Sequence, residues 1–212
     1  RKFSMHTKVV LTMSVALTVG GAVIFRITED MPWIGALFNS VTARTAGFST
    51  YSLGEFSNAG LLAMIFLMFV GASPGSTGGG IKTSTLFALI QGIKTAATNT
   101  SGKAFHYSVP HGVFRKASVI AVMGISVIAV GTFMLCAFEP DIAIRDALFE
   151  MTSAFGTVGL TTGITTGLCT ASKLTSIVMM YIGRLGPLTI ATLWYFTNGD
   201  RIKYPDGNIA IG

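Results

Sequence analysis

The chain consists of long apolar stretches separated by short polar connections. Apolar runs of about 20 residues lie at 8–27, 113–138 and 174–196, and each is long enough to cross the hydrocarbon core of a bilayer as a helix. A fourth run is interrupted, because the apolar stretch 61–72 is followed by a glycine-rich segment before a helical pattern resumes at 81–93. The pattern predicts an all-α membrane protein that crosses the bilayer four times.

This pattern occurs twice, about 112 positions apart. TAGFST at 45–50 and TVGLTT at 157–162 occupy the same place in the two copies, as do MFVGAS at 68–73 and MYIGRL at 180–185. Each copy opens with an apolar helix, continues through a shorter helix beginning Ala-Leu-Phe (36–38 and 147–149), turns at Thr-x-Gly and returns through a second apolar stretch. Such repetition in an apolar chain suggests a pore rather than a soluble enzyme.

The Thr-x-Gly turns lie where a short helix must reverse direction. A half-helix at 33–43 is too short to span a bilayer, so we expect a re-entrant half-helix whose irregular backbone is buried in protein or lines water. Carbonyl oxygens around a glycine can replace the hydration shell of a monovalent cation, as in filters of sequence TVGYG. The partial negative charge at each half-helix C-terminus also favours a cation. The candidate ion-binding residues are Thr45, Ala46, Gly47, Phe48, Thr157, Val158, Gly159 and Leu160. The alternative is that both glycines only mark tight turns.

The glycine-rich interruption does not fit a phosphate-binding loop, since Ile81 follows Gly80 where that motif requires lysine. Inside a membrane span, consecutive glycines uncoil a helix and leave polar backbone facing a cavity, so the segment is a candidate gate or a static kink. Arg184 interrupts the last apolar run, where it either sets a barrier for passing cations or bonds backbone carbonyls to hold the copies together. The candidate gating residues are Gly71, Ala72, Ser73, Pro74, Gly75, Ser76, Thr77, Gly78, Gly79, Gly80, Lys82 and Arg184.

Composition supports a bilayer environment. Hydrophobic residues make up 50% of the chain and charged residues 11%, the mean hydropathy is +0.64, and soluble domains carry about 25% charged residues. With four crossings drawn, basic residues fall on one side, which predicts that this side is cytoplasmic. They are Arg1, Lys2, Lys8, Lys94, Lys103, Arg115, Lys116, Arg201 and Lys203. The other side receives Glu29, Asp30, Glu55, Glu139, Asp141, Asp146 and Glu150, which either attract cations or merely avoid the inner leaflet.

Four longer stretches carry a specific resemblance: NSVTARTAGFST, MFVGASPGSTGGGIKT, FGTVGLTTG and YIGRLGPLT. Over essentially its whole length the chain resembles the C-terminal half of the membrane subunit of a bacterial Ktr-type potassium transporter, in the Trk/Ktr/HKT superfamily. The resemblance implies a four-repeat, potassium-channel-like pore, with residues 1–99 as the third pore repeat and residues 113–200 as the fourth. Residues 100–112 then form a cytoplasmic linker and residues 201–212 a cytoplasmic C-terminal tail. Gly47 and Gly159 become filter glycines, segment 71–80 the gating loop and Arg184 the pore arginine.

The resemblance also implies partners and a location. The expected setting is the bacterial cytoplasmic membrane with surrounding lipid, a homodimer, a ring of cytoplasmic nucleotide-binding regulatory subunits, and missing N-terminal repeats. K+ is the expected transported ion and Na+ a stimulating ion, with no organic cofactor, no metal beyond K+ in the filter and no nucleic-acid partner for the net charge of +6. A two-repeat protein that dimerises to complete the pore is the alternative to a fragment.

Potassium uptake through a carbonyl-lined filter, without enzymatic activity, is therefore the expected function. The alternatives are a non-conducting structural or scaffolding membrane module and a sodium-permeable relative. An ATP-driven pump is disfavoured, because the sequence has no phosphate-binding loop.

Overall fold

The computed structural model describes residues 3–98, 103–104, 107–108, 111–186 and 189. The described elements are almost all helical: α1 (Met5–Thr28), α2 (Trp33–Thr42), η1 (Leu53–Glu55), α3 (Asn58–Phe69), α4 (Thr83–Thr98), α5 (His111–Phe138), α6 (Ile144–Gly156), η2 (Thr165–Gly167) and α7 (Thr170–Leu185). A two-residue-per-strand antiparallel hairpin, β1 (Lys103–Ala104) and β2 (Tyr107–Ser108), lies within the expected linker. The tail 201–212 and most of the run after Gly186 lie outside the described residues.

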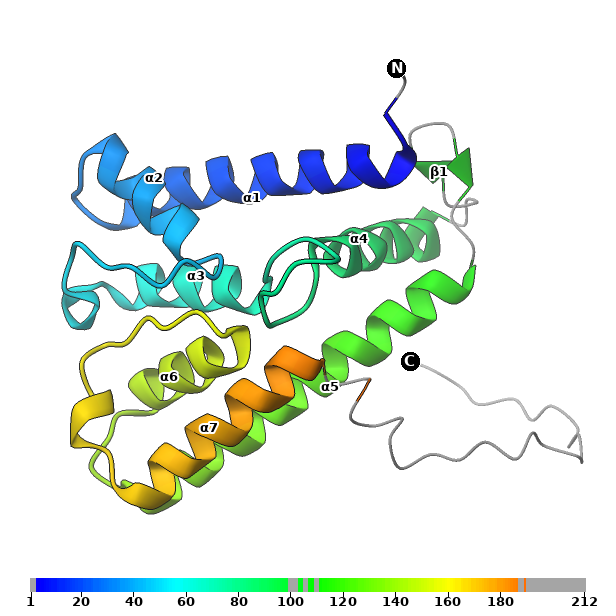
Figure 1. The fold of residues 1–212 in the computed structure, drawn as a ribbon. Helices are drawn as coiled ribbons and strands as arrows, with labels where there is room; N and C mark the ends of the chain where they lie inside the picture. Colours follow the sequence, from blue (N-terminus) through cyan, green and yellow to red (C-terminus); the bar gives the residue numbers. More distant parts are fainter. Residues whose placement is uncertain (1–2, 99–102, 105–106, 109–110, 187–188, 190–212) are drawn as a thin grey trace, which may run out of the picture.

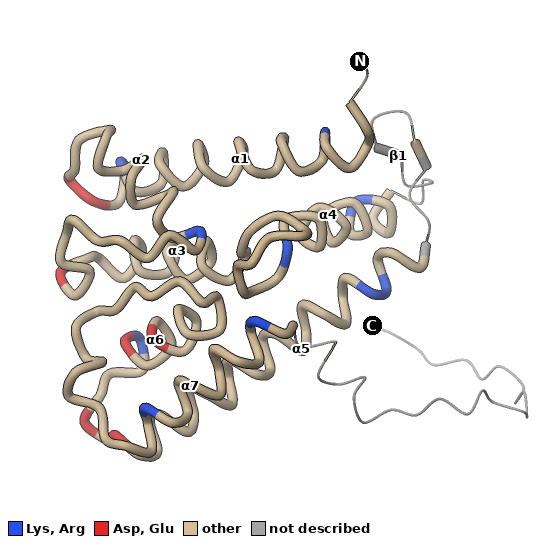
Figure 2. Tube along the Cα trace, viewed as in Figure 1, with Lys and Arg blue, Asp and Glu red and all other residues tan. Residues whose placement is uncertain are grey.

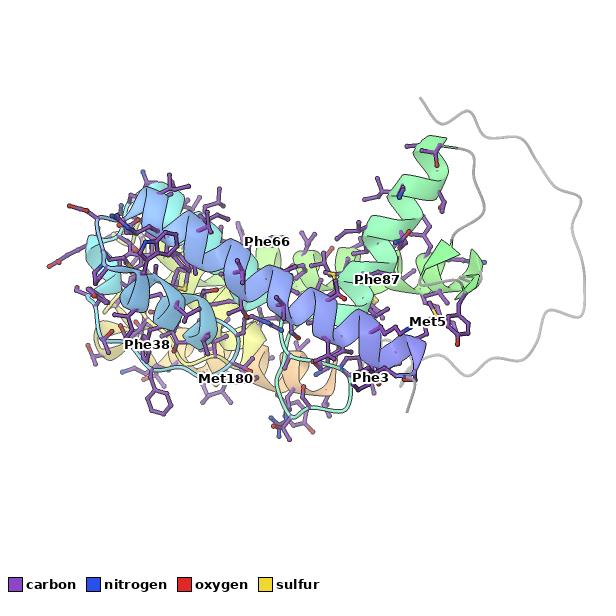
Figure 3. All side chains as sticks on the ribbon, turned by 90° about the horizontal axis from the view of Figure 1, so that it is seen from above. Phe3, Met5, Phe38, Phe66, Phe87 and Met180 are labelled. Atoms are coloured by element: carbon purple, nitrogen blue, oxygen red, sulfur yellow. The ribbon has the colours of Figure 1, made fainter. Side chains whose placement is uncertain are left out.

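The helices form two groups that lie one above the other in Figure 1. Helices α1, α2 and α3 make one group and α5, α6 and α7 the other, with α7 running alongside α5. Helix α4 is seen nearly end-on in Figure 1 and rises away from the other helices when the molecule is viewed from above, where Phe87 is labelled near its base (Figure 3). Helices α3 and α4 therefore do not continue one another, although they are consecutive in the chain.

Element order is the same in both groups, but the boundaries differ from the sequence expectation. Helices α2 and α6 both begin three residues before their Ala-Leu-Phe motifs, at Trp33 and Ile144. Helix α7 likewise begins at Thr170 rather than at residue 174 and ends at Leu185, where Gly186 has φ +87°.

The third helix of each group begins at a cap supplied by the end of the first. Glu29 accepts hydrogen bonds from the Ser57 N–H at 3.1 Å and the Ser57 hydroxyl at 2.6 Å, directly before α3. Glu139, directly after α5, accepts the Cys169 N–H at 2.6 Å before α7. These bonds hold the pKa of Glu139 below its ordinary value, the Cys169 N–H being the largest cause. Two carboxylates expected at an acidic mouth thus satisfy helix N-termini, which leave their first N–H groups without intrahelical partners.

Close helix contacts rely on small residues, as is typical of helices packed in a membrane. A Cβ on Gly183 of α7 would collide with the Phe155 carbonyl of α6, and a Cβ on Gly21 of α1 would collide with Ser40 of α2. One core cluster joins Phe25 and Met64 of the first group to Phe149 of the second. The two groups therefore share one packed core.

Within the described part of the chain, two helices are long and apolar enough to cross a membrane, by length and composition: Met5–Thr28 and Gly112–Phe138. Helix α3 is apolar but shorter. Asp and Glu residues gather at one end of the molecule (Figure 2), where α1 leads into α2 and α5 leads into α6. The described basic residues Lys8, Lys94, Arg115 and Lys116 lie near the opposite ends of α1, α4 and α5, whereas Arg26, Arg145 and Lys173 lie at the acidic end. Arg1, Lys2, Arg201 and Lys203 are outside the described residues.

Candidate functional site

The two Thr-x-Gly segments have the same unusual backbone. Thr45 and Thr157 are the two non-glycine residues with positive φ in the described part of the chain, at 71° and 52°. Gly47 and Gly159 follow them with φ of 77° and 93°. Left-handed backbone is unfavourable for a β-branched residue, so a threonine in this conformation at both places marks a strained, specifically supported turn.

Each segment begins at the C-terminal end of a short helix. Val158 N–H donates to the Ser153 carbonyl at 2.9 Å, and Ala46 N–H donates to the Thr42 carbonyl at 3.2 Å. The Thr42 hydroxyl also bonds the main chain of Phe48, accepting its N–H at 2.8 Å and donating to its carbonyl at 2.5 Å. The Phe48 carbonyl therefore points back toward α2.

The two segments lie against each other. A Cβ placed on Gly159 would lie 4.0 Å from the Gly47 Cα, and a Cβ on Gly47 would collide with the Val158 carbonyl. Glycine is required at Gly47 both by its positive φ and by this approach. The Phe48 side chain is 72% exposed, so the structure brings the backbones of the candidate ion-binding residues together without covering this face.

The glycine-rich segment 71–80 is a closed loop between α3 and α4. Val70 and Ile81 form an isolated parallel bridge, and the Ile81 N–H donates to the Phe69 carbonyl at 3.0 Å. Gly75 and Gly80 have positive φ, which a side chain would oppose. The interruption is thus an excursion that leaves and returns at one point, not a bend at a single residue.

The far side of this loop lies against both Thr-x-Gly segments. Gly79 N–H donates to the Thr157 hydroxyl at 2.8 Å, and a Cβ on Gly78 would lie 3.0 Å from the Thr45 hydroxyl. The loop therefore meets the first residue of each segment, so the candidate gating residues and the candidate ion-binding residues form one site.

Two cationic side chains bond neighbouring carbonyls of the loop. Lys82 Nζ donates to the Gly78 carbonyl at 2.5 Å, and Arg184 of α7 donates to the Thr77 carbonyl. Helix α7 can hold the loop in this way because Gly183 allows it to approach the Phe155 backbone closely. Arg184 is exposed apart from this contact with a backbone carbonyl, and both roles expected from the sequence stay predictions.

Sequence reasoning did not single out Arg44, although a lone arginine between an apolar helix and a glycine turn is a readable signal. Its guanidinium donates to the Ser14 carbonyl at 3.2 Å and to the Thr18 hydroxyl at 3.4 Å, so it ties the start of the TAGF segment to α1.

Glu150, expected at an acidic mouth, is instead buried in α6.

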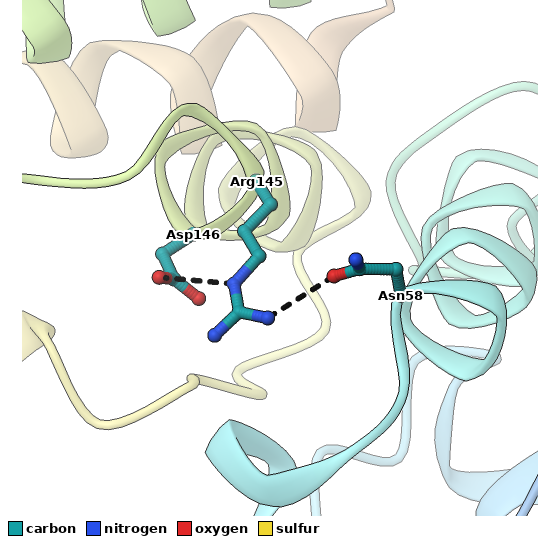
Figure 4. Close-up of polar contacts among 3 residues, drawn as sticks. All are labelled: Asn58, Arg145 and Asp146. Carbon is teal, nitrogen blue, oxygen red and sulfur yellow. Dashed lines mark hydrogen bonds and ion pairs between the residues drawn. The ribbon is translucent and has the colours of Figure 1, made fainter.

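A polar contact also joins the two groups at the acidic end. Arg145 of α6 donates to the Asn58 side-chain oxygen at 3.0 Å and lies 3.6 Å from the Asp146 carboxylate (Figure 4). Because Asn58 starts α3, this contact links the N-terminal turns of helices from both groups.

Comparison with known families gives a match to TrkH, described as a cation transport protein, over residues 4–201. The chain belongs to the TrkH family. Its members are membrane proteins that transport cations rather than enzymes, as the sequence predicts. The family resemblance inferred from the four motif stretches is thereby confirmed.

Several relatives of this TrkH-family chain are potassium uptake proteins by name. It is 33% identical to Ktr system potassium uptake protein B of Bacillus subtilis, over all of this chain and 50% of that protein. It is 35% identical to the protein of the same name from Vibrio alginolyticus, over 98% of this chain and 48% of that protein. It is 35% identical to potassium/sodium uptake protein NtpJ of Enterococcus hirae, over all of this chain and 51% of that protein.

The fold agrees with this assignment. The potassium transporter TrkH from Vibrio parahaemolyticus superimposes with a TM-score of 0.70 at 21% identity, over 90% of this chain and 44% of that structure. The chain spans about half the length of the curated relatives it matches.

Proposed function

We propose that this chain supplies two of the four sides of a pore through which K+ crosses the bacterial cytoplasmic membrane. In this proposal α2 and α6 are re-entrant pore helices, and Thr45–Phe48 and Thr157–Leu160 are filter segments whose carbonyls replace the hydration shell of the ion. The observation that carries the proposal is the contact of the Gly47 and Gly159 backbones at the C-terminal ends of two short helices. Helix C-termini and carbonyl oxygens both stabilise a cation.

The loop 71–80 is the gate in this proposal. It lies directly against Thr45 and Thr157, and it is held by side-chain bonds from Lys82, Thr157 and Arg184. Release of these contacts would move the loop while the Val70–Ile81 bridge keeps the helix ends in place. Arg184 adds a fixed positive charge below the filter, which raises the barrier for a passing cation.

The half-length match supports one part of the proposed assembly, in which the N-terminal repeats of a longer protein complete the pore. We propose further that two such proteins form a homodimer in lipid and that a ring of nucleotide-binding subunits contacts the cytoplasmic side, where the C-terminus lies. Na+ acts as a stimulating ion. Basic residues near the predicted cytoplasmic ends of α1, α4 and α5 support this orientation.

Uptake of K+ by cells that lack their own potassium transporters tests the function. The complete protein should restore growth at low K+, whereas a scaffolding module would not.

The filter and the gate are tested by two variants. Gly159→Ser should lower the preference for K+ over Na+, because a side chain at φ +93° displaces the carbonyls. An unchanged preference would argue against the filter assignment. Deletion of Gly78–Gly80 removes the loop contact with Thr157 and should raise flux, and flux at or below the parent level would argue for a static loop.

A sodium-permeable transporter is the second candidate, favoured by the name of the Enterococcus hirae relative. Rubidium and Na+ uptake measured side by side separate the two candidates. Equal rates at equal concentrations would favour the sodium-permeable transporter.

A further inference from the structure

Glu150 is the one charged residue that is buried among the residues the structure describes. It lies in the middle of α6, whose C-terminal end begins the TVGL segment. The Thr165 hydroxyl lies 3.1 and 3.0 Å from the two Glu150 carboxylate oxygens and 2.7 Å from the Thr161 hydroxyl, which donates to Oε1. Both threonines belong to the stretch that directly follows TVGL.

The TVGL segment is therefore fastened to one helix at both ends. At its start, the Val158 N–H bonds the Ser153 carbonyl, and just beyond its end, Thr161 and Thr165 bond Glu150. The two attachment points on α6 are three residues apart, or roughly 4.5 Å along the helix axis. A segment held at both ends over such a short span has little freedom to change the positions of its carbonyls.

The space beside this attachment is open. Glu150, Thr161 and Thr165 line a hollow of ≈ 440 Å³ together with Thr157–Leu160, Ser176 and Met180. Met180 of α7 is labelled along the same edge of the molecule as Phe38 of α2 when the molecule is seen from above (Figure 3). The hollow leaves one side of TVGL open, whereas the Val158 and Leu160 side chains are buried in the shared core. The carboxylate contacts therefore add a polar attachment on the open side.

In the first group a different side chain makes the second attachment. Counted from the shared Ala-Leu-Phe motif, Asn39 takes the place of Glu150. Its amide donates to the Gly35 carbonyl at 3.0 Å and to the Met31 sulfur at 3.6 Å, so it stays within its own helix and the preceding turn. The TAGF segment is instead held at both ends through Thr42. The two groups thus fix their segments by different devices.

We propose that Glu150 is a positioning residue that sets the K+ over Na+ preference by fixing the end of the TVGL segment. This inference rests on the proposed function, since it concerns the filter assigned there. Na+ is smaller than K+, so a filter whose carbonyls close in on the ion loses preference for K+. Loss of the Glu150 attachment frees the end of one filter segment and permits that closure.

The test uses the complete protein in membrane vesicles, with rubidium and Na+ as the probes. Glu150→Ala should lower the ratio of rubidium to Na+ uptake about tenfold, the effect of losing more than 1 kcal/mol of hydrogen bonding to a charged group. Glu150→Gln, whose oxygen still accepts from Thr165, should restore most of the ratio. Thr165→Val removes the same contact from an exposed position, so it should lower the ratio without risk to the buried core.

Two controls separate positioning from other roles. Asp141→Asn removes a carboxylate from an exposed position between α5 and α6, at the acidic end of the molecule, and should leave the ratio unchanged. In a Glu150→Ala background, Thr165→Val should have no further effect, because the two changes break one attachment. Additive effects, or a Gln variant as impaired as the Ala variant, would overturn the positioning role.

Failure of this inference differs from failure of the proposed function. If the unmodified protein takes up neither rubidium nor Na+, the conduction proposal itself fails. If it takes up rubidium in preference to Na+ and Glu150→Ala keeps that preference, only the role of Glu150 is refuted.

Discussion

The bond between the loop and the TVGL segment can be tested by removing one hydroxyl group. Thr157→Val keeps the β-branched shape at a position with φ 52°, so the backbone strain of the parent is retained. The hydroxyl that accepts the Gly79 N–H at 2.8 Å is lost. The change therefore weakens the hold on the loop without altering the size of the side chain.

The magnitude follows from the burial of Gly79. This residue is buried, so its N–H would be left without a partner, which costs about 1–3 kcal/mol. If the loop obstructs the pore in the observed arrangement, the variant destabilises this obstructed arrangement by the same roughly 1–3 kcal/mol relative to an arrangement in which the loop has moved. A shift of 1–3 kcal/mol corresponds to about 5- to 150-fold in the equilibrium.

Rubidium uptake into vesicles containing the complete protein measures this shift. We expect Thr157→Val to raise the uptake rate severalfold at unchanged protein content. Thr45→Val is the matched control: it removes the equivalent hydroxyl at φ 71°, but that hydroxyl donates to the Arg44 carbonyl and accepts no bond from the loop. Uptake by Thr157→Val that does not exceed uptake by Thr45→Val would refute the idea that the loop is latched in a blocking position.

Two further predictions concern Gly47 and Glu139. Gly47→Ala places a Cβ against the Val158 carbonyl and adds backbone strain of about 1–2 kcal/mol at its positive φ. Rubidium uptake should therefore fall far more than in Gly163→Ala, where φ is +105° but nothing lies within 4 Å of the added Cβ. Equal losses of uptake in the two variants would show that backbone strain alone matters. The pKa of Glu139 is lowered in the fold by the Cys169 N–H, so its contribution to stability is present above the ordinary value of 4.5 and is lost as pH falls through the lowered value. Thermal unfolding in detergent can be followed across pH 3 to 6, a range of about one to two units around the ordinary pKa. The melting temperature should fall on acidification, and it should fall less in Glu139→Gln. Identical pH profiles of the melting temperature would contradict the capping role.

The helices follow directly from local sequence pattern. Apolar runs and the duplicated Thr-x-Gly turns predict α1, α2, α5 and α6 to within a few residues, because hydrophobicity and glycine act locally along the chain. The early starts of α3 and α7 could not be read in this way. Each depends on a carboxylate from the end of a helix about 30 positions earlier, and only the fold brings Glu29 to Ser57 and Glu139 to Cys169.

Features of the site also divide into those visible in the local sequence and those that only the fold creates. The two glycine turns, the glycine-rich segment and Arg184 are visible as residue types that are unusual inside apolar stretches. Their mutual contacts are not, since Gly79 and Thr157 are 78 positions apart. Glu150 shows the limit most clearly. In sequence it is one of several acids near a predicted membrane face, and in the fold it is buried and bonds the threonine hydroxyls that follow TVGL.

Because the bridge between Val70 and Ile81 joins the two ends of the loop, the relative positions of α3 and α4 do not depend on how many residues the loop contains. Since the ends of the loop are fixed to each other, the exposed residue Ser76, beside Gly75, can be replaced without changing the directions of α3 or α4. That position is consequently a suitable attachment point for a fluorescent or spin label, one that would report loop displacement while leaving the surrounding scaffold undisturbed.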